Sequence, residues 1–169
     1  VLTIDFEDTN APTKFVDSFK SSGFAIIKNH PINSSLIGDV YKNWESFFAS
    51  KIKHNYTFNS KSQDGYFPYL TENAKNSFTK DLKEFYHIYS WGKFPDTINP
   101  STMELYNQII DFGGKLLSWL DRCSPNSIKN NFSEPLESMI QDSDSNLFRI
   151  IHYPPIDGNV DKNALRASP

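Results

Sequence analysis

The order of apolar and polar positions along the chain predicts helices that alternate with short strands. Alternation over residues 2–6 is typical of a strand, whereas apolar residues spaced three and four apart predict helices. A helix that starts near Asn10 is expected to end at Gly23, because glycine readily adopts the left-handed conformation that closes helices. The predicted elements are, in order, a strand at 2–6, a helix at 10–22, a buried strand at 24–28, a helix at 33–49, a long loop at 55–80, a strand at 82–91, helices at 101–121 and 133–140, and a strand at 146–153.

The helix predicted at 101–121 carries the clearest signals. Ser101 and Glu104 have the spacing of a capping box at its start. One face of this helix is apolar and consists of Leu105, Ile109, Phe112, Leu116 and Leu120. Gly113 and Gly114 lie in the middle and each cost roughly 1 kcal/mol relative to alanine. The glycine pair therefore indicates that another segment packs closely against the helix.

Composition and charge restrict the class of protein. The chain has 169 residues, of which 15% are aromatic, so it can form one domain, or one domain and part of another, with an aromatic core. Seventeen basic and twenty acidic residues give a net charge of -3 without a basic stripe, which argues against nucleic-acid partners. No apolar run reaches eighteen residues, so no membrane span is expected. The single cysteine, Cys123, fits a reducing compartment, and we expect a cytoplasmic protein.

The titratable residues offer no complete catalytic constellation. Four histidines, His30, His54, His87 and His152, are scattered along the chain without a carboxylate at His-x-Asp spacing. We interpret each of them as a core or surface residue. The adjacent charges of Lys83 and Glu84 are interpreted as a solvated face.

Several segments nevertheless resemble one enzyme family in order and spacing. The strand at 146–153 ends in Tyr153 and is followed by Pro154 and Pro155. Further matching segments are the opening strand at 1–6, Gly23-Phe24-Ala25-Ile26-Ile27-Lys28-Asn29-His30, Trp44-Glu45-Ser46-Phe47-Phe48, Asp64-Gly65-Tyr66 and Asp81-Leu82-Lys83-Glu84-Phe85-Tyr86-His87. Together they resemble the amino-terminal region of the iron(II)/2-oxoglutarate-dependent oxygenases, in the branch that includes isopenicillin N synthase.

This resemblance implies an α+β fold in which a helix-rich amino-terminal region leads into a double-stranded β-helix, or jelly roll. Residues 1–143 would form the amino-terminal region and 144–169 the first part of the jelly roll, whose remaining strands are absent from this chain. In the family a His-x-Asp pair and a distant histidine hold the iron and leave positions open for 2-oxoglutarate and oxygen. The chain ends about where that first histidine is expected. Binding of Fe(II) and of 2-oxoglutarate would thus both require residues beyond Pro169, and no catalytic or metal-binding residue is expected within the chain.

Three residues are candidates for binding roles. Strand alternation places Arg149 and Tyr153 on one face, together with Leu147 and Ile151. The resemblance implies that Tyr153 contacts 2-oxoglutarate and that Arg149 and Tyr66 contact the organic substrate. The alternative is structural: a tyrosine bonded to a structural partner, an arginine that extends toward solvent, and a Tyr66 that stabilises a turn. Many relatives have asparagine where this chain has Ile151, which removes one polar contact to the cosubstrate.

The sequence thus predicts part of a cytoplasmic dioxygenase that oxidises a small organic substrate and decarboxylates 2-oxoglutarate to succinate. Two alternatives stay open. The intact protein could be an iron oxidase that dispenses with 2-oxoglutarate, as isopenicillin N synthase does. It could also be a metal-free ligand-binding or scaffold module of the same fold. Small molecules are the expected partners, with no nucleic acid and no membrane, and the oligomeric state is not indicated.

Overall fold

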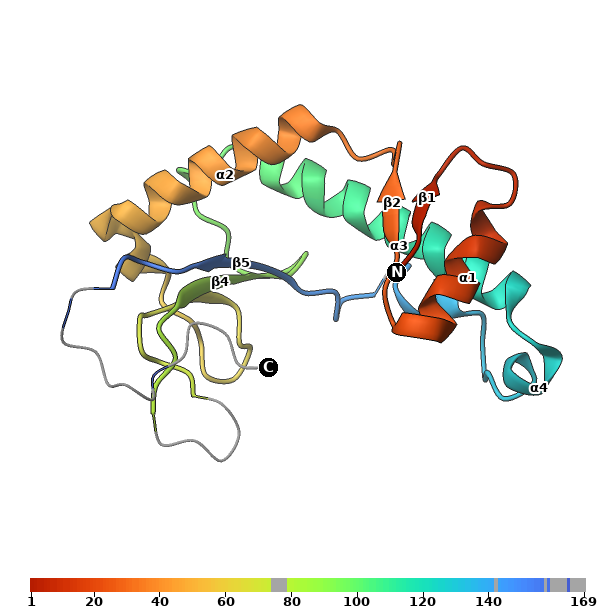
Figure 1. Ribbon diagram of the computed structural model, residues 1–169. Helices are drawn as coiled ribbons and strands as arrows, with labels where there is room; N and C mark the ends of the chain where they lie inside the picture. The colour runs from red at the N-terminus through yellow and green to blue at the C-terminus, as the bar shows by residue number, and fades with distance from the viewer. Residues whose placement is uncertain (74–78, 142, 157, 159–163, 165–169) are drawn as a thin grey trace. The chain divides into compact units, whose positions relative to one another are not determined.

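A computed structural model describes residues 1–73, 79–141, 143–156, 158 and 164 (Figure 1). The chain forms two compact units, each assembled from segments that are distant in the sequence. Unit 1 comprises Val1–Ile37 and Ser101–Ser143, and unit 2 comprises Gly38–Pro100 and Asp144–Pro169. The predicted division into an amino-terminal region and the first part of a jelly roll at 143/144 stays a prediction.

Unit 1 contains a small parallel sheet with helices beside it. Strand β1 (Thr3–Asp5) pairs with β2 (Ile26–Lys28), and α1 (Ala11–Ser22) connects them. Gly23 ends α1 in the left-handed conformation, with φ of 73°, as its position in the sequence predicts. Asn29 also has positive φ, and its amide Nδ2 donates to both carboxylate oxygens of Asp5 at 2.9 and 3.1 Å. This bond joins the ends of the two strands.

The long helix α3 (Ser101–Cys123) supplies much of the unit 1 core, and α4 (Asn126–Lys129) and the 3-10 helix η2 (Leu136–Met139) follow it. A Cβ atom added at Gly113 would lie 3.2 Å from Ile140 Cδ1, so the close packing predicted at the glycine pair is confirmed. The buried centre of unit 1 consists of Ile4, Ala11, Phe15 and Trp119.

Unit 2 contains a three-stranded antiparallel sheet. Strands β3 (Gly65–Phe67), β4 (Glu84–Ile88) and β5 (Phe148–His152) lie side by side with β4 in the centre. Residues 38–49 of helix α2 (Ser34–Ala49) cover one face of the sheet (Figure 1). On this face the ring centroids of Trp44 and Tyr86 are 5.0 Å apart. The 3-10 helix η1 (Lys51–Tyr56) continues directly from α2 toward β3.

The strand register determines which side chains share a face of this sheet. Glu84 pairs with His152, and His87 pairs with Arg149. Because side chains alternate along a strand and paired residues point the same way, Glu84 and His152 lie on the α2 side, together with Tyr66. Arg149 and His87 lie on the opposite side, which we call the outer face. The predicted alternation of Arg149 and Ile151 is consistent with this register.

Three sequence predictions need correction. Strand β3 lies inside the stretch predicted as a long loop at 55–80, because three residues are too few to show an alternation; positions 74–78 of that stretch lie outside the described residues. The helix predicted at 133–140 is only the four-residue 3-10 helix η2 (Leu136–Met139), and α4 was not predicted. The strand predicted to be buried at 24–28 is buried on one face only, because side chains alternate along it: Phe24 is 69% and Ile26 55% exposed, whereas Ala25 and Ile27 pack against the unit 1 core.

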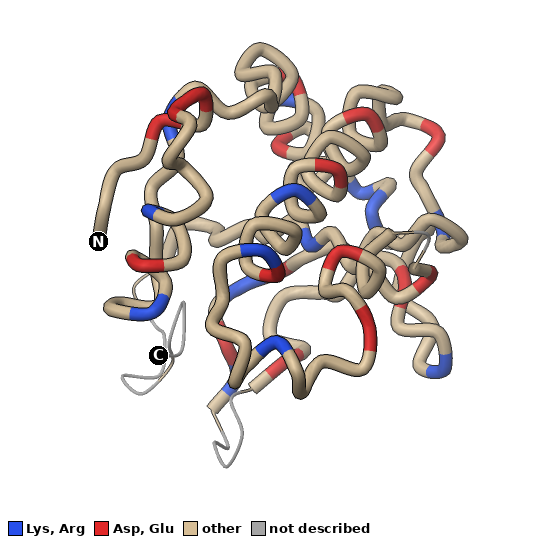
Figure 2. Tube along the Cα trace, turned by 90° about the vertical axis from the view of Figure 1, so that its right-hand side faces the viewer, with Lys and Arg blue, Asp and Glu red and all other residues tan. Residues whose placement is uncertain are grey.

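Charged residues of both signs occur in both units. Acidic and basic residues are interspersed along the trace without a long run of one sign (Figure 2). Within the described ranges, none of the helices combines the length and apolar content needed to cross a membrane.

Candidate functional site

The α2 side of the unit 2 sheet holds a buried carboxylate with three partners. Glu84 is 5% exposed, and its Oε2 accepts a hydrogen bond from Lys53 Nζ at 2.8 Å and another from the Tyr66 hydroxyl at 2.5 Å. His152 Nδ1 lies 2.7 Å from Glu84 Oε1 and therefore carries a proton, because an ionised carboxylate only accepts hydrogen bonds. We call these four residues the Glu84 cluster. It connects η1, β3, β4 and β5.

Electrostatics favour the ionised form of Glu84. Burial raises the pKa of this carboxyl, but the hydrogen bonds from Lys53, Tyr66 and His152 outweigh burial and hold the pKa below its usual value. Burial raises the pKa of the Tyr66 hydroxyl, and the neighbouring Glu84 charge raises it further. The cluster therefore contains a carboxylate anion, a lysine cation and a neutral tyrosine near pH 7.

This lowered pKa predicts that Glu84 contributes to the acid sensitivity of folding. Its stabilising contribution is complete above the ordinary pKa of 4.5 and is lost as the pH falls through the lower folded-state pKa. We expect wild-type protein to lose more free energy of unfolding than Glu84→Gln between about pH 6 and pH 3. Urea unfolding at each pH measures the difference, and parallel pH profiles of the two proteins would contradict the prediction.

On the outer face, Arg149 is held by an aromatic stack and a histidine. The rings of Phe58, Phe67 and Phe85 stack with centroids 4.1 and 4.5 Å apart, and the Arg149 guanidinium carbon lies 4.4 Å from the Phe85 centroid. Arg149 Nε donates to His87 Nε2 at 2.8 Å. The guanidinium thus lies over the outermost ring of the aromatic stack and is also held by His87, two contacts that restrict the direction of its remaining N–H groups.

The hydrogen bonds of His87 define its tautomer. His87 Nδ1 lies 2.9 Å from the Gln63 carbonyl oxygen and must donate to it, so Nε2 is free to accept from Arg149. Burial lowers the pKa of His87, and the nearby Arg149 charge lowers it further. His87 is therefore neutral near pH 7 and serves to orient Arg149.

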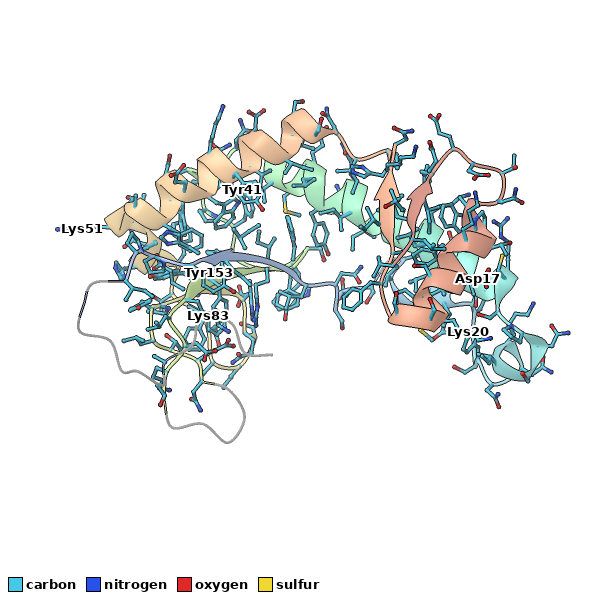
Figure 3. All side chains as sticks on the ribbon, viewed as in Figure 1. Asp17, Lys20, Tyr41, Lys51, Lys83 and Tyr153 are labelled. Carbon is cyan, nitrogen blue, oxygen red and sulfur yellow. The ribbon has the colours of Figure 1, made fainter. Side chains whose placement is uncertain are left out.

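The three residues predicted to bind ligands are not all brought together. Arg149 lies on the outer face, whereas Tyr66 lies on the α2 side, is 1% exposed, and donates its hydroxyl to Glu84. A substrate that reached Tyr66 would have to displace that bond, and its predicted substrate contact stays a prediction. Tyr153 directly follows β5 and is 38% exposed (Figure 3). Continued alternation from Ile151 would place it with Arg149.

Sequence reasoning missed the residues that organise both faces. The interpretation of Lys83 and Glu84 as a solvated face is wrong, because Glu84 is buried in its cluster and the Lys83 side chain is 14% exposed. One signal was available: a glutamate within a strand otherwise rich in aromatic and apolar residues needs buried partners. His87 and His152 gave no sequence signal for their contacts with Arg149 and Glu84.

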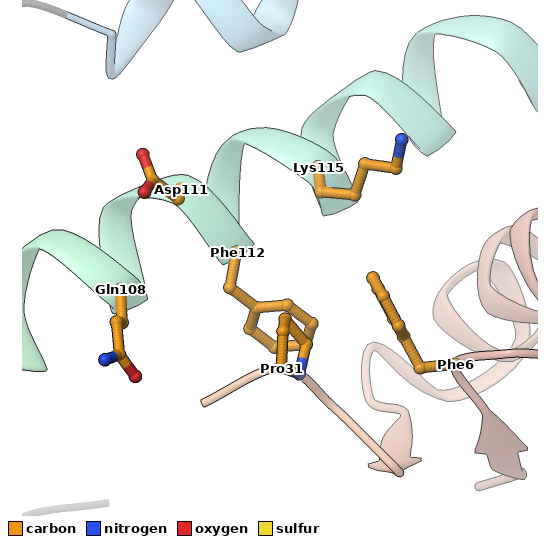
Figure 4. A pocket seen from close by; sticks show the side chains of 6 residues that line it. All are labelled: Phe6, Pro31, Gln108, Asp111, Phe112 and Lys115. Atoms are coloured by element: carbon orange, nitrogen blue, oxygen red, sulfur yellow. The ribbon is translucent and has the colours of Figure 1, made fainter. Parts of the chain in front are cut away.

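Unit 1 has a small pocket on α3. It is lined by Phe6, Pro31, Gln108, Asp111, Phe112 and Lys115 (Figure 4), and the ring centroids of Phe6 and Phe112 are 5.6 Å apart. Its volume of about 230 Å³ is below the range of most small-molecule sites, so we assign no ligand to it. Among the described residues, no group of three or more histidine, cysteine, aspartate or glutamate side chains is placed to hold a metal ion.

Comparisons with known proteins identify the fold. The family model for the amino-terminal region of a non-haem dioxygenase in morphine synthesis matches residues 3–111. An oxygenase from Shewanella oneidensis is 38% identical, with a TM-score of 0.86 over 98% of this chain and 59% of its own. A 2OG-Fe(II) oxygenase family protein from Caulobacter crescentus is 23% identical, with a TM-score of 0.68 over 93% of this chain and 57% of its own.

A further solved structure shows the same fold at lower identity. A full-length protein from Neurospora crassa, in complex with alpha-KG and thymine, is 18% identical, with a TM-score of 0.59 over 91% of this chain and 55% of its own. No curated protein matches the chain. The chain thus spans less than two thirds of the length of these three structures. The family match over 109 of 169 residues and the 38% identity across nearly the whole chain agree with the fold, and the chain belongs to the non-haem iron(II)/2-oxoglutarate-dependent oxygenase family.

Proposed function

We propose that the intact protein is an Fe(II)/2-oxoglutarate-dependent dioxygenase that oxidises a small organic substrate and decarboxylates 2-oxoglutarate to succinate. The observation that carries this proposal is the 38% identity to the Shewanella oxygenase over 98% of the chain. The Caulobacter relative is a 2OG-Fe(II) oxygenase family protein, and the Neurospora structure holds alpha-KG and thymine, which supports this cofactor pair and a small-molecule substrate. The jelly roll and the iron ligands would come from residues beyond Pro169.

The described residues of this chain would bind and orient the organic molecules. Iron, held elsewhere in the intact protein, would supply the oxidation chemistry. Arg149 would face the substrate, because its guanidinium is held by Phe85 and by His87, while within the described residues its Nη2 makes only a long ion pair of 3.6 Å with the partly exposed Glu72. Tyr153 would contact 2-oxoglutarate through its hydroxyl. The Glu84 cluster would hold β4 and β5 in register on the opposite side, which keeps Arg149 in place.

The proposal predicts a metal and cosubstrate requirement that the full-length protein can show. Full-length protein should bind about one ferrous ion per chain and form succinate from 2-oxoglutarate in air, and a chelator should abolish both. Residues 1–169 alone should neither bind iron tightly nor form succinate. Metal analysis after gel filtration and a succinate assay provide the two measurements.

The two alternatives give different results in the same experiment. Stoichiometric iron without consumption of 2-oxoglutarate, in the presence of a confirmed organic substrate, would indicate the oxidase that dispenses with this cosubstrate. A folded full-length protein that binds no iron would indicate the metal-free module. Either result would overturn the proposed dioxygenase activity.

A further inference from the structure

Glu72 lies between two cations on the outer face of the unit 2 sheet. Its Oε1 is 3.6 Å from Arg149 Nη2, and its Oε2 is 3.3 Å from Lys83 Nζ. Both cations also lie near the Phe85 ring, Arg149 at 4.4 Å and Lys83 at 5.9 Å from its centroid. The Glu72 carboxylate thus lies between the positive charges of Arg149 and Lys83, both of which lie near the Phe85 ring.

The two cations are anchored independently of Glu72. Arg149 is held by Phe85 and by its bond to His87. Lys83 Nζ lies 3.0 Å from the buried Asp81 carboxylate. Burial lowers the pKa of Lys83, but Asp81 and Glu72 outweigh it and hold the pKa above its usual value, so this amine stays charged. Removal of the Glu72 carboxylate would therefore leave both cations in place.

Glu72 is the member of this group that can move. Its side chain is 34% exposed, compared with 8% for Asp81, and 3.6 Å is longer than a hydrogen bond. Its backbone is held separately, because the Asp81 amide donates to the Glu72 carbonyl oxygen at 2.9 Å. The Glu72 side chain can thus rotate away without a rearrangement of the chain.

The positive and negative charges of this group are equal in number when one carboxylate occupies the Glu72 position. Arg149 and Lys83 supply two positive charges, and Asp81 and Glu72 supply two negative charges, while His87 is neutral. If a carboxylate from a ligand replaced that of Glu72, the net charge of the site would be unchanged. A neutral ligand would leave one cation without a partner and is disfavoured.

We propose that Glu72 occupies the substrate-anchoring position in the free protein and that a carboxylate of the organic substrate displaces it onto Arg149 and Lys83. This inference rests on the proposed function and adds the substrate class, an organic acid, together with the role of Glu72 as an internal competitor that determines specificity. The ligand carboxylate would accept charge-assisted hydrogen bonds from the Arg149 Nη groups.

Binding of simple acids to full-length protein tests this proposal. Acetate, benzoate and phenylacetate, each paired with its neutral amide, are titrated by NMR into wild type and Glu72→Gln. Because Glu72→Gln removes the competing charge, the acids should bind about two- to fivefold more tightly to this variant, the gain expected from loss of a partly exposed ion pair. The amides should show no gain. The control is Glu45→Gln, which removes an exposed carboxylate from α2 and should change neither series.

The outcomes separate this inference from the proposed function. 2-Oxoglutarate is titrated in the same way, and a gain for 2-oxoglutarate but not for the three acids would assign the site to the cosubstrate and overturn the inference. Equal affinity of wild type and Glu72→Gln for every acid, or no preference for acids over amides, would overturn it as well. The titrations do not depend on turnover, so a failure of the succinate assay would refute the proposed function without deciding the role of Glu72.

Discussion

Glu84→Ala is expected to lower the free energy of unfolding by about 3–5 kcal/mol, the cost of breaking a buried ion pair by removal of one partner. Lys53, which is 17% exposed, would keep its charge without a counterion, and the Tyr66 hydroxyl and His152 Nδ1 would lose their acceptor. Urea unfolding of full-length protein, followed by circular dichroism, measures the loss.

Two variants show whether the effect comes from the cluster. Lys53→Met combined with Glu84→Met should recover the part of the loss that comes from the uncompensated Lys53 charge, whereas Tyr66 and His152 still lack their acceptor. Glu45→Ala, at an exposed position of α2, should change stability by no more than about 0.5 kcal/mol. Strictly additive effects of the two methionine substitutions would show that Lys53 and Glu84 are not coupled.

The local features of the fold could be predicted from the sequence. Gly23 ends α1 through its own backbone conformation, and the pair Gly113 and Gly114 showed that some segment packs closely on α3, although not that this segment contains Ile140. Strand β5 was predicted from its apolar run. The family resemblance was also readable, since it depends on the order of short segments rather than on their contacts.

The Glu84 cluster could not be predicted, because its contacts join distant parts of the chain. The partners of Glu84 lie 31, 18 and 68 positions away at Lys53, Tyr66 and His152. Sequence periodicity reports whether a residue faces a core, not which residue it will meet there. A charged residue next to Lys83 thus resembled a solvated face, although three hydrogen bonds compensate for its burial.

Strand pairing places two of the predicted ligand-binding residues, Arg149 and Tyr66, on opposite faces of the unit 2 sheet. Alternation along one strand placed Arg149 relative to Ile151, but the position of Tyr66 depends on the register of β3 against β4. That register pairs Tyr66 with Tyr86, and both side chains lie on the α2 side, away from Arg149. Likewise, Glu72 gave no signal in the sequence, because its position between Lys83 and Arg149 depends on how the segment before β4 folds over the outer face.

Arg149→Ala and Tyr153→Phe should weaken turnover of the full-length protein through binding rather than through the metal. Loss of a hydrogen bond to a charged carboxylate costs on the order of 1.5 to 3 kcal/mol, or roughly ten- to hundredfold in affinity. We expect a raised KM for the organic substrate in Arg149→Ala and a raised KM for 2-oxoglutarate in Tyr153→Phe, with unchanged iron content in both.

Because Arg149 also contacts Phe85 and His87, its variants need a test of folding. Arg149→Lys keeps the positive charge but has no planar guanidinium to lie on Phe85 and present two Nη groups, so its KM for the substrate should fall between those of wild type and Arg149→Ala. Glu45→Gln provides the control with unchanged constants. If folded Arg149→Ala and Tyr153→Phe both retained wild-type KM values for both substrates, neither side chain would contact a ligand, and the contacts of Arg149 with Phe85, His87 and Glu72 would be purely structural.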